Sequence, residues 1–589
     1  MALVDHLFAV IPMLGILILV HELGHFLVAK ACGVRVLKFS IGFGAPIGIG
    51  RYRLRWERGG TEYVVGWIPL GGFVRMLGET LPGDEVEPSL VPEDARPEEF
   101  LEAKPVWQKL SIVFAGPLMN LVLPIVFLVG ILWVGLPRAS AVIGAVEPIS
   151  PAAEAGLQVG DQIRAVDGTP VRWWDEVLEP IREGRAGSEV RLAIERGDET
   201  REIAVELDSQ TALDRFGSVD EIGWIGIGHR RQPALVGVPE GSSPAARAGL
   251  RSGDRVQAVA GRAVEDWVGL VEAQREAARE ARARGESRIA WRVERDESPL
   301  VLPDPSAAAQ ASEPEPEREI PVLELSLPAE PDVSGLGLVP AAILVGRVEP
   351  GMPAERAGLQ AGDLILAVEG RPIGSFERFA SIVQTSGGRP IELTFSREGR
   401  VATSVLEPEE HVVPGPYEIE GMEQKRFVVG IRSALSTLPG ATGTLRIRNP
   451  LESLPRAVAM SAQMTADFLV GVGKLATGEV GTDQLSGPIG IARIARESLD
   501  RGWLDYLSMM MLISINLGIL NLLPIPILDG GQAVLYGIEG IKRSPVSPRA
   551  REIATQLGLV LLILLMGRAF WNDLTPFWSQ LMRWLSSQS

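Results

Sequence analysis

The run His21-Glu22-Leu23-Gly24-His25 carries the residue types best suited to chemistry in this chain. A spacing of four residues places the two imidazoles on one helix face, one turn apart, where both can bind the same Zn²⁺. The carboxylate of Glu22 then lies beside the metal, where it can take a proton from a water molecule. Because the chain holds only five histidines, a chance match to this motif is rare.

The motif lies in an apolar stretch, residues 7–29, that is long enough to cross a bilayer. A charged residue in a membrane-spanning helix costs roughly 2.5 to 3.5 kcal/mol on insertion scales, so such groups are normally functional. The alternative is a histidine pair that only makes hydrogen bonds within a helix bundle. The sequence favours a metal site.

Three further apolar stretches predict a polytopic α-helical membrane protein with about four transmembrane helices. They cover residues 110–136, 504–528 and 553–574, and Pro524 and Pro526 interrupt the third stretch. Eleven Lys and Arg residues fall in 30–109 and none in 1–6, so the positive-inside rule places the 30–109 loop in the cytoplasm. The large 137–503 segment and both termini are then outside.

A catalytic zinc usually has three protein ligands and an open position for water. The predicted topology places the remaining histidines, His6, His229 and His411, away from the motif, which favours a carboxylate as the third ligand. Asp529 fits best, because the third span brings it to the membrane depth at which the first span presents His21 and His25. Asp505 and Glu539 fit less well, since the same reasoning places them at the outer surface and beyond the inner one.

The outer segment contains one pattern three times, at residues 150–171, 243–264 and 352–373. Each copy predicts a short helix ending at Gly, a Gly-Asp turn and an alternating strand. The pattern resembles PDZ domains, α+β folds that bind extended peptides by strand addition. We expect PDZ-like domains at 142–207, 222–300 and 335–435, with a disordered linker rich in Pro, Glu and Ala at 301–334. The alternative is a PDZ-like fold that binds no peptide and acts only as a spacer or a shield.

Composition excludes two other classes of protein. The net charge of −17 argues against a nucleic-acid binder, whose affinity needs a basic surface. Cys32 is the only cysteine, so the fold has no internal disulfide framework.

Several motifs in order along the chain resemble the site-2 protease family of intramembrane zinc metalloproteases, in the bacterial regulator of sigma-E protease type. These are HELGH at 21–25, GFG at 42–44, IPLGG at 68–72, FAGPLMN at 114–120, LSGPIGIA at 485–492 and NLLPIPILDGG at 521–531. The resemblance implies that His21, His25 and Asp529 bind zinc and that Glu22 is the catalytic acid and base. It also implies that Asn521 holds the substrate backbone, although a hydrogen bond between helices would explain this residue equally.

The resemblance further implies a cytoplasmic, membrane-dipping β-hairpin around 42–74 that pairs with an unwound substrate. The substrate-binding residues would be Asn521, Pro524, Gly42, Gly44, Gly71 and Gly72. We expect the first two transmembrane helices, with HExxH and a cytoplasmic β-rich loop, at 1–136 and the last two, with the NxxPxPxLDG motif, at 485–574. An amphipathic membrane-surface helix is expected at 455–476. Two departures are the third repeat, where familiar members have two, and Gln532, where a histidine is common.

The expected function is cleavage of single-span membrane proteins within the bacterial inner membrane, with the PDZ-like domains in the periplasm. Partners would be these substrates, extended peptides or ectodomains at the repeats, and membrane lipid, but no nucleic acid. A non-catalytic PDZ scaffold with a vestigial metal site is the alternative; intact Glu22 argues against it. A metal transporter is less consistent, because the ionisable residues concentrate at one depth.

Overall fold

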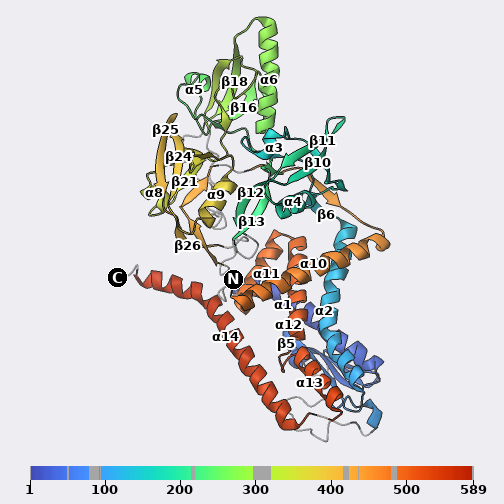
Figure 1. Ribbon diagram of the computed structural model, residues 1–589. Helices are drawn as coiled ribbons and strands as arrows, with labels where there is room; N and C mark the ends of the chain where they lie inside the picture. The colour runs from blue at the N-terminus through green and yellow to red at the C-terminus, as the bar shows by residue number, and fades with distance from the viewer. Residues whose placement is uncertain are drawn as a thin grey trace. The chain divides into compact units, whose positions relative to one another are not determined.

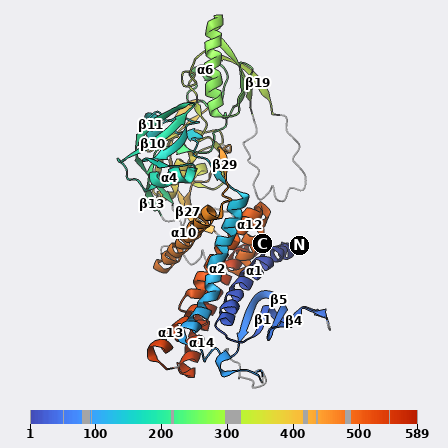
Figure 2. The same ribbon diagram turned by 90° about the vertical axis from the view of Figure 1, so that its right-hand side faces the viewer.

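The chain folds into two units, one dominated by helices and the other by small sheets. The computed structural model describes residues 2–49, 52–78, 92, 94–213, 219–295, 320–414, 423–434, 437–478, 487–544 and 546–586. The helical unit comprises Met1–Leu136, Pro414–Gln424 and Leu445–Ser589, and the sheet unit comprises Pro137–Val413 and Lys425–Thr444. Figures 1 and 2 show the elements of each unit.

Among the described residues, four helices are long and apolar enough to cross a membrane, as the sequence predicts. They are α1 (Ala2–Ala31), α2 (Val106–Val134), α12 (Trp503–Leu522) and α14 (Pro548–Ser586). Helix α2 packs against both α1 and α12 and so lies at the centre of the bundle (Figure 2). The other helices described in this unit are α10 (Pro450–Thr477), α11 (Pro488–Arg501), α13 (Asp529–Lys542) and the single 3-10 turn η2 (Pro97–Glu99).

The third apolar helix is shorter than the sequence predicts. It ends at Leu522 instead of continuing to residue 528, and α13 begins anew at Asp529. Pro524 and Pro526 explain the break, because proline lacks the backbone N–H that a helix needs and its ring clashes with the preceding turn. Asp529 therefore lies at the start of a separate helix.

A small sheet packs against α1 in the same unit. Its strands are β1 (Val36–Pro46), β4 (Arg55–Arg58) and β5 (Thr61–Met76), with a short hairpin of β2 (Gly48–Ile49) and β3 (Tyr52–Arg53) alongside. Residues 38–41 pair with both 62–65 and 72–75, so β5 doubles back and encloses β1 between its two halves. The half at 72–76 forms one edge of this sheet. The buried core between sheet and helix includes Ala29, Val36, Phe39, Val74 and Met76.

The sheet unit repeats one arrangement three times, a four-stranded antiparallel sheet with one short and one longer helix. The first repeat has α3 (Pro151–Glu154), β8 (Gln162–Val166), β9 (Thr169–Pro170), α4 (Trp174–Glu183), β10 (Glu189–Arg196) and β11 (Glu199–Glu206). The second has α5 (Pro244–Arg247), β16 (Arg255–Val259), β17 (Arg262–Ala263), α6 (Trp267–Arg284), β18 (Arg288–Glu294) and β19 (Val322–Pro328). The third has α8 (Pro353–Arg356), β22 (Leu364–Val368), β23 (Arg371–Pro372), α9 (Phe376–Thr385), β24 (Ile391–Arg397) and β25 (Arg400–Leu406).

Each repeat is completed by a two-stranded ladder whose second strand comes from far along the chain. These ladders are β7 (Ala145–Val146) with β14 (Ile227–Gly228), β15 (Val236–Gly237) with β20 (Val339–Pro340), and β21 (Val345–Val348) with β28 (Ile431–Ser433). Residues 227–228 and 339–340 therefore pair with the repeat that precedes them, although the predicted domain bounds of 222–300 and 335–435 include them in the repeat that follows. The remaining ladders join β6 (Leu136–Ala139) to β29 (Thr442–Leu445), β12 (Asp208–Leu213) to β13 (Val219–Trp224), and β26 (Glu409–Pro414) to β27 (Glu423–Val428).

The expected linker is partly a strand. Residues 301–319 lie outside the described residues, but β19 spans Val322–Pro328 and pairs along its length with β18. The disordered linker therefore does not extend to residue 334 as expected. Leu327 is fully buried beneath this sheet, so alternation of apolar and polar residues outweighs the Pro- and Glu-rich composition there.

A buried ion pair recurs in all three repeats. The Asp of each Gly-Asp turn is almost completely buried. It accepts two hydrogen bonds of 2.6 to 2.7 Å from an Arg at the end of β10 or β24, or directly after β18. The same Arg donates to the carbonyl of the Gly that ends the short helix. The pairs are Asp161–Arg196, Asp254–Arg295 and Asp363–Arg397. Such bidentate contacts fix the turn against the sheet.

We expect Asp254→Ala to destabilise the second repeat by about 3 to 5 kcal/mol, because it leaves the Arg295 charge without its partner. Hydrogen exchange of the detergent-solubilised protein would report this as lost protection of β16 and β18. Glu324→Ala is the matched control, since it removes only the exposed partner of Arg292. Equal protection of the two variants would contradict the assigned role.

Candidate metal centre

The two histidines of the HExxH motif lie on α1 with only 8% of each residue exposed. His25 Nδ1 donates a hydrogen bond of 2.8 Å to the carbonyl oxygen of Ile112 on α2. That bond fixes the proton on Nδ1 and leaves Nε2 with a free lone pair, which is the form of histidine that binds metal.

Three ligand atoms converge at the Nε2 side of these rings. The Nε2 atoms of His21 and His25 lie 3.2 Å apart, and the Asp529 carboxylate oxygens lie 3.2 Å from the first and 3.7 Å from the second. Among the described residues, this is the one group of three metal-ligating side chains, with all ligand atoms within 4.8 Å of one another. Two imidazole nitrogens and one carboxylate form a ligand set typical of catalytic zinc.

The break after α12 brings Asp529 to the histidines, and two glycines allow it to do so. A Cβ atom at Gly530 would lie 2.2 Å from the carbonyl oxygen of Leu522, and one at Gly531 would lie 2.2 Å from that of Ile525. Any larger residue would therefore push α13 away from the broken segment. The Asp-Gly-Gly sequence is a packing requirement as well as a source of the ligand.

Glycines also bring α1 and α2 together at the depth of the motif. A Cβ at Gly24 would lie 2.3 Å from the carbonyl oxygen of Ala115. A Cβ at Gly116 would lie only 2.2 Å from His25 Nε2. The His25 ring thus occupies the space that a side chain at position 116 would take, and Gly116 sets the position of the ring.

Glu22 lies on α1 between the two histidines in sequence and contacts the edge of the small sheet. The backbone N–H of Val74 on β5 donates to its carboxylate. A Cβ at Gly72 would lie 3.2 Å from Glu22 Cγ, so the strand passes close to this side chain. The same carboxylate therefore lies near both the ligand group and a sheet edge.

The other residues predicted to bind substrate lie on two elements. Gly42 and Gly44 on β1 have φ values of +85° and +87°, which bend the strand in a way that favours glycine. Gly71 faces the ring of Phe43 so closely that a Cβ there would overlap it. Asn521 is near the end of α12 and partly buried, and Pro524 is exposed in the break. Gly72 alone of the six has a close approach to Glu22 among the described contacts.

Sequence reasoning missed the contacts that orient the histidine rings. The Ile112 carbonyl, Gly116 and Asn120 all come from α2, and Gly116 and Asn120 belong to the run FAGPLMN, which served above only as a family motif. A Gly and an Asn four residues apart in an apolar helix lie on one face, which is a detectable signal.

We expect Gly116→Ala to lower zinc affinity, on the order of 10- to 100-fold, because the new methyl group displaces the His25 ring. Zinc content and affinity of the purified protein are the measurements. Gly130→Ala in the same helix is the control, since a Cβ there meets nothing within 4 Å. Unchanged zinc affinity in the Gly116 variant would show that the ring position is not set by α2.

Comparison with known proteins identifies the family of the chain. The family model described as Peptidase family M50 matches residues 9–565. Protease RseP of Yersinia pestis is 32% identical over 97% of this chain and 99% of its own length. Regulator of sigma-E protease RseP of Escherichia coli is 32% identical over 95% of this chain and 96% of its own length.

A protein of Neisseria meningitidis serogroup A, named as a zinc metalloprotease, is 30% identical over 95% of this chain and 96% of its own length. A solved PDZ domain of an SdrC-like protein from Listeria monocytogenes matches 15% of the chain at 27% identity, with a TM-score of 0.13. The chain therefore belongs to peptidase family M50, which confirms the resemblance to site-2 proteases and the prediction of a zinc metalloprotease.

Proposed function

We propose that this protein cleaves single-span membrane proteins within the bilayer, using zinc held by His21, His25 and Asp529. The observation that carries the proposal is the convergence of these three ligands between apolar helices. No idle polar group is favourable in such surroundings, because lipid offers no hydrogen-bond partners.

Glu22 is the proton carrier in this proposal. A bound zinc ion would polarise the scissile carbonyl and lower the pKa of a water molecule at its open position. The Glu22 carboxylate takes the proton from that water and later delivers it to the nitrogen of the leaving amine. The Val74 N–H holds the carboxylate in place between the two transfers.

The half of β5 at residues 72–76 is the proposed substrate-binding edge. The Val74 N–H at this edge points toward Glu22, so a peptide added to the edge would pass beside the catalytic carboxylate. A peptide bond inside a helix is covered and its carbonyl is already hydrogen-bonded, so the substrate must unwind first. Strand addition then compensates the freed backbone groups. Gly42, Gly44, Gly71 and Gly72 keep this region narrow, while Asn521 and Pro524 supply contacts from the α12 end.

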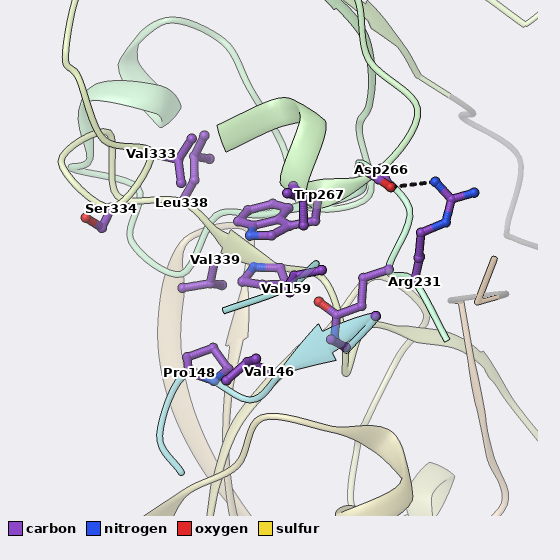
Figure 3. A pocket seen from close by; sticks show the side chains of 15 residues that line it. Val146, Pro148, Val159, Arg231, Asp266, Trp267, Val333, Ser334, Leu338 and Val339 are labelled. Atoms are coloured by element: carbon purple, nitrogen blue, oxygen red, sulfur yellow. Dashed lines mark hydrogen bonds and ion pairs between the residues drawn. The ribbon is translucent and has the colours of Figure 1, made fainter. Parts of the chain in front are cut away.

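The repeats bind extended segments of substrate ectodomains in this proposal. Between the first and second repeats lies a cavity of about 260 Å³ with apolar walls (Figure 3). Trp267 lies in the middle of the view, and Arg231 and Asp266 form an ion pair of 2.7 Å at one side. A pocket of this size accepts an apolar side chain, and the polar pair can hold the backbone beside it.

The protein is proposed to lie in the bacterial inner membrane, with the repeats in the periplasm. The charge bias of the 30–109 loop supports this orientation. Helix α10 is proposed to rest on the membrane surface, since it is amphipathic and exposes the apolar side chains of Leu451, Leu454, Val458, Leu469 and Val470.

We expect Glu22→Gln to abolish cleavage while zinc stays bound, because this side chain moves protons and is not a ligand. Asp529→Ala should lose both cleavage and zinc. Cleavage of a reconstituted single-span substrate and zinc analysis are the two measurements.

Asp505→Ala is the control for the metal ligand, because Asp505 lies in the first turn of α12, at the opposite end of the helix from the break. It should retain zinc. Turnover by the Glu22 variant would remove the proposed proton carrier, and normal zinc in the Asp529 variant would assign the third ligand elsewhere.

Cys32 tests the orientation, because it is the only thiol and directly follows α1. A membrane-impermeant maleimide should label it only after the inner membrane is opened. Labelling in denaturant provides the full-signal control for this partly buried residue. Labelling with the outer membrane alone permeabilised would invert the topology, including the side of the repeats.

A further inference from the structure

Asn120 on α2 is completely buried, and its side-chain amide points at His21, on the Nδ1 side of the ring. Its Nδ2 atom as placed lies 3.2 Å from His21 Nδ1. Its Oδ1 atom is buried and finds no hydrogen-bond partner among the described residues. A buried acceptor without a partner is destabilising, so this arrangement needs an explanation.

The tautomer of His21 provides that explanation. Its Nε2 atom faces Asp529 and His25 and is the atom placed for a metal. An imidazole that binds metal through Nε2 carries its proton on Nδ1, and that N–H can only donate. An amide NH₂ group can also only donate, so two donors would meet at 3.2 Å. The oxygen and nitrogen of an amide have nearly the same shape, and rotation by half a turn replaces this clash with a hydrogen bond.

We propose that Asn120 accepts a hydrogen bond from His21 Nδ1–H through Oδ1 and thereby orients the ring with Nε2 toward zinc. The inference rests on the proposed zinc site. Asn120 is a positioning residue and touches neither substrate nor metal. Its role parallels that of the Ile112 carbonyl, which accepts from His25 Nδ1 about two turns earlier on the same helix.

Helix α12 fixes Asn120 in turn. The hydroxyl of Ser514, which is completely buried, donates a hydrogen bond of 2.7 Å to the main-chain carbonyl oxygen of Asn120. Close packing at Gly518, where a Cβ would lie 3.0 Å from the Pro117 carbonyl oxygen, holds the two helices together near this point. The helix that leads to Asp529 therefore also supports the residue that orients His21.

The neutral amide suits this position better than a charged acceptor would before metal binds. A carboxylate behind His21 would add a second buried negative charge near Asp529, and buried charges are costly unless compensated. Once the divalent cation is present, either acceptor satisfies the Nδ1–H. An apolar side chain of the same shape offers no acceptor to His21 Nδ1–H, with or without the metal.

The test compares the zinc affinity of the detergent-solubilised full chain and three variants by competition with a chromogenic chelator. Asn120→Leu removes the acceptor at similar volume and should weaken zinc binding on the order of 10- to 100-fold. Asn120→Asp keeps an acceptor that cannot donate and should bind zinc at least as tightly as the natural protein. Asn516→Leu is the matched control, because Asn516 on α12 also has a buried Oδ1 without a partner among the described residues. It should leave zinc affinity unchanged.

Equal zinc affinity of Asn120→Leu and the natural protein would overturn the inference. So would an Asn120→Asp variant as weak as the Leu variant, since the amide would then act as a donor. Circular dichroism of the metal-free variants separates loss of fold from loss of metal; if Asn120→Leu does not fold, the Asn120→Asp result alone decides. If the natural protein binds no zinc that depends on Asp529, the proposed function fails instead.

Discussion

The approach of His21, His25 and Asp529 to a common point is the constraint on which the helical unit depends. Each of these side chains is polar and lies among apolar helices, so each needs a partner from the protein itself. Their meeting requires three backbone segments to come closer than ordinary side chains permit. The glycines at positions 24, 116, 530 and 531 supply that closeness, since a Cβ at any of them would overlap a neighbouring atom. The same close helix packing that these glycines allow therefore also sets the geometry of the three candidate metal ligands.

Much of the site could be predicted from sequence because its signals are local or follow from topology. The spacing of His21 and His25 is a property of one helix turn, and Asp529 follows from the direction of the third apolar stretch. The ring orientation could not be predicted in this way. It depends on Ile112 and Asn120, which lie 87 and 99 residues from the histidines that they contact. Their hydrogen-bonding atoms leave no trace in a hydropathy pattern.

The repeats show a different limit of sequence reasoning. The Gly-Asp turns and alternating strands were evident, and the glycines of these turns do have positive φ. The closing strands of the first two repeats were assigned to the wrong repeat, because a two-residue strand such as Ile227–Gly228 carries no periodicity. Composition was also misleading at Val322–Pro328, where residues rich in Pro and Glu flank a strand that buries Leu327. Pairing across long sequence distances decided both cases.

The repeats and the candidate metal centre are stabilised by different interactions, so the repeats can vary in number without changing the metal-ligating residues. Every repeat has its own apolar core and its own buried Asp–Arg pair. The candidate metal centre, in contrast, tolerates little change, because its ligands, their hydrogen-bond partners and the nearby glycines are in direct contact with one another. A third repeat can therefore be accommodated in a chain whose HExxH and Asp-Gly-Gly sequences match the family pattern. The departure at Gln532 is tolerable for the same reason, since the ligand atoms come from Asp529 and the close contacts come from the two glycines that follow it.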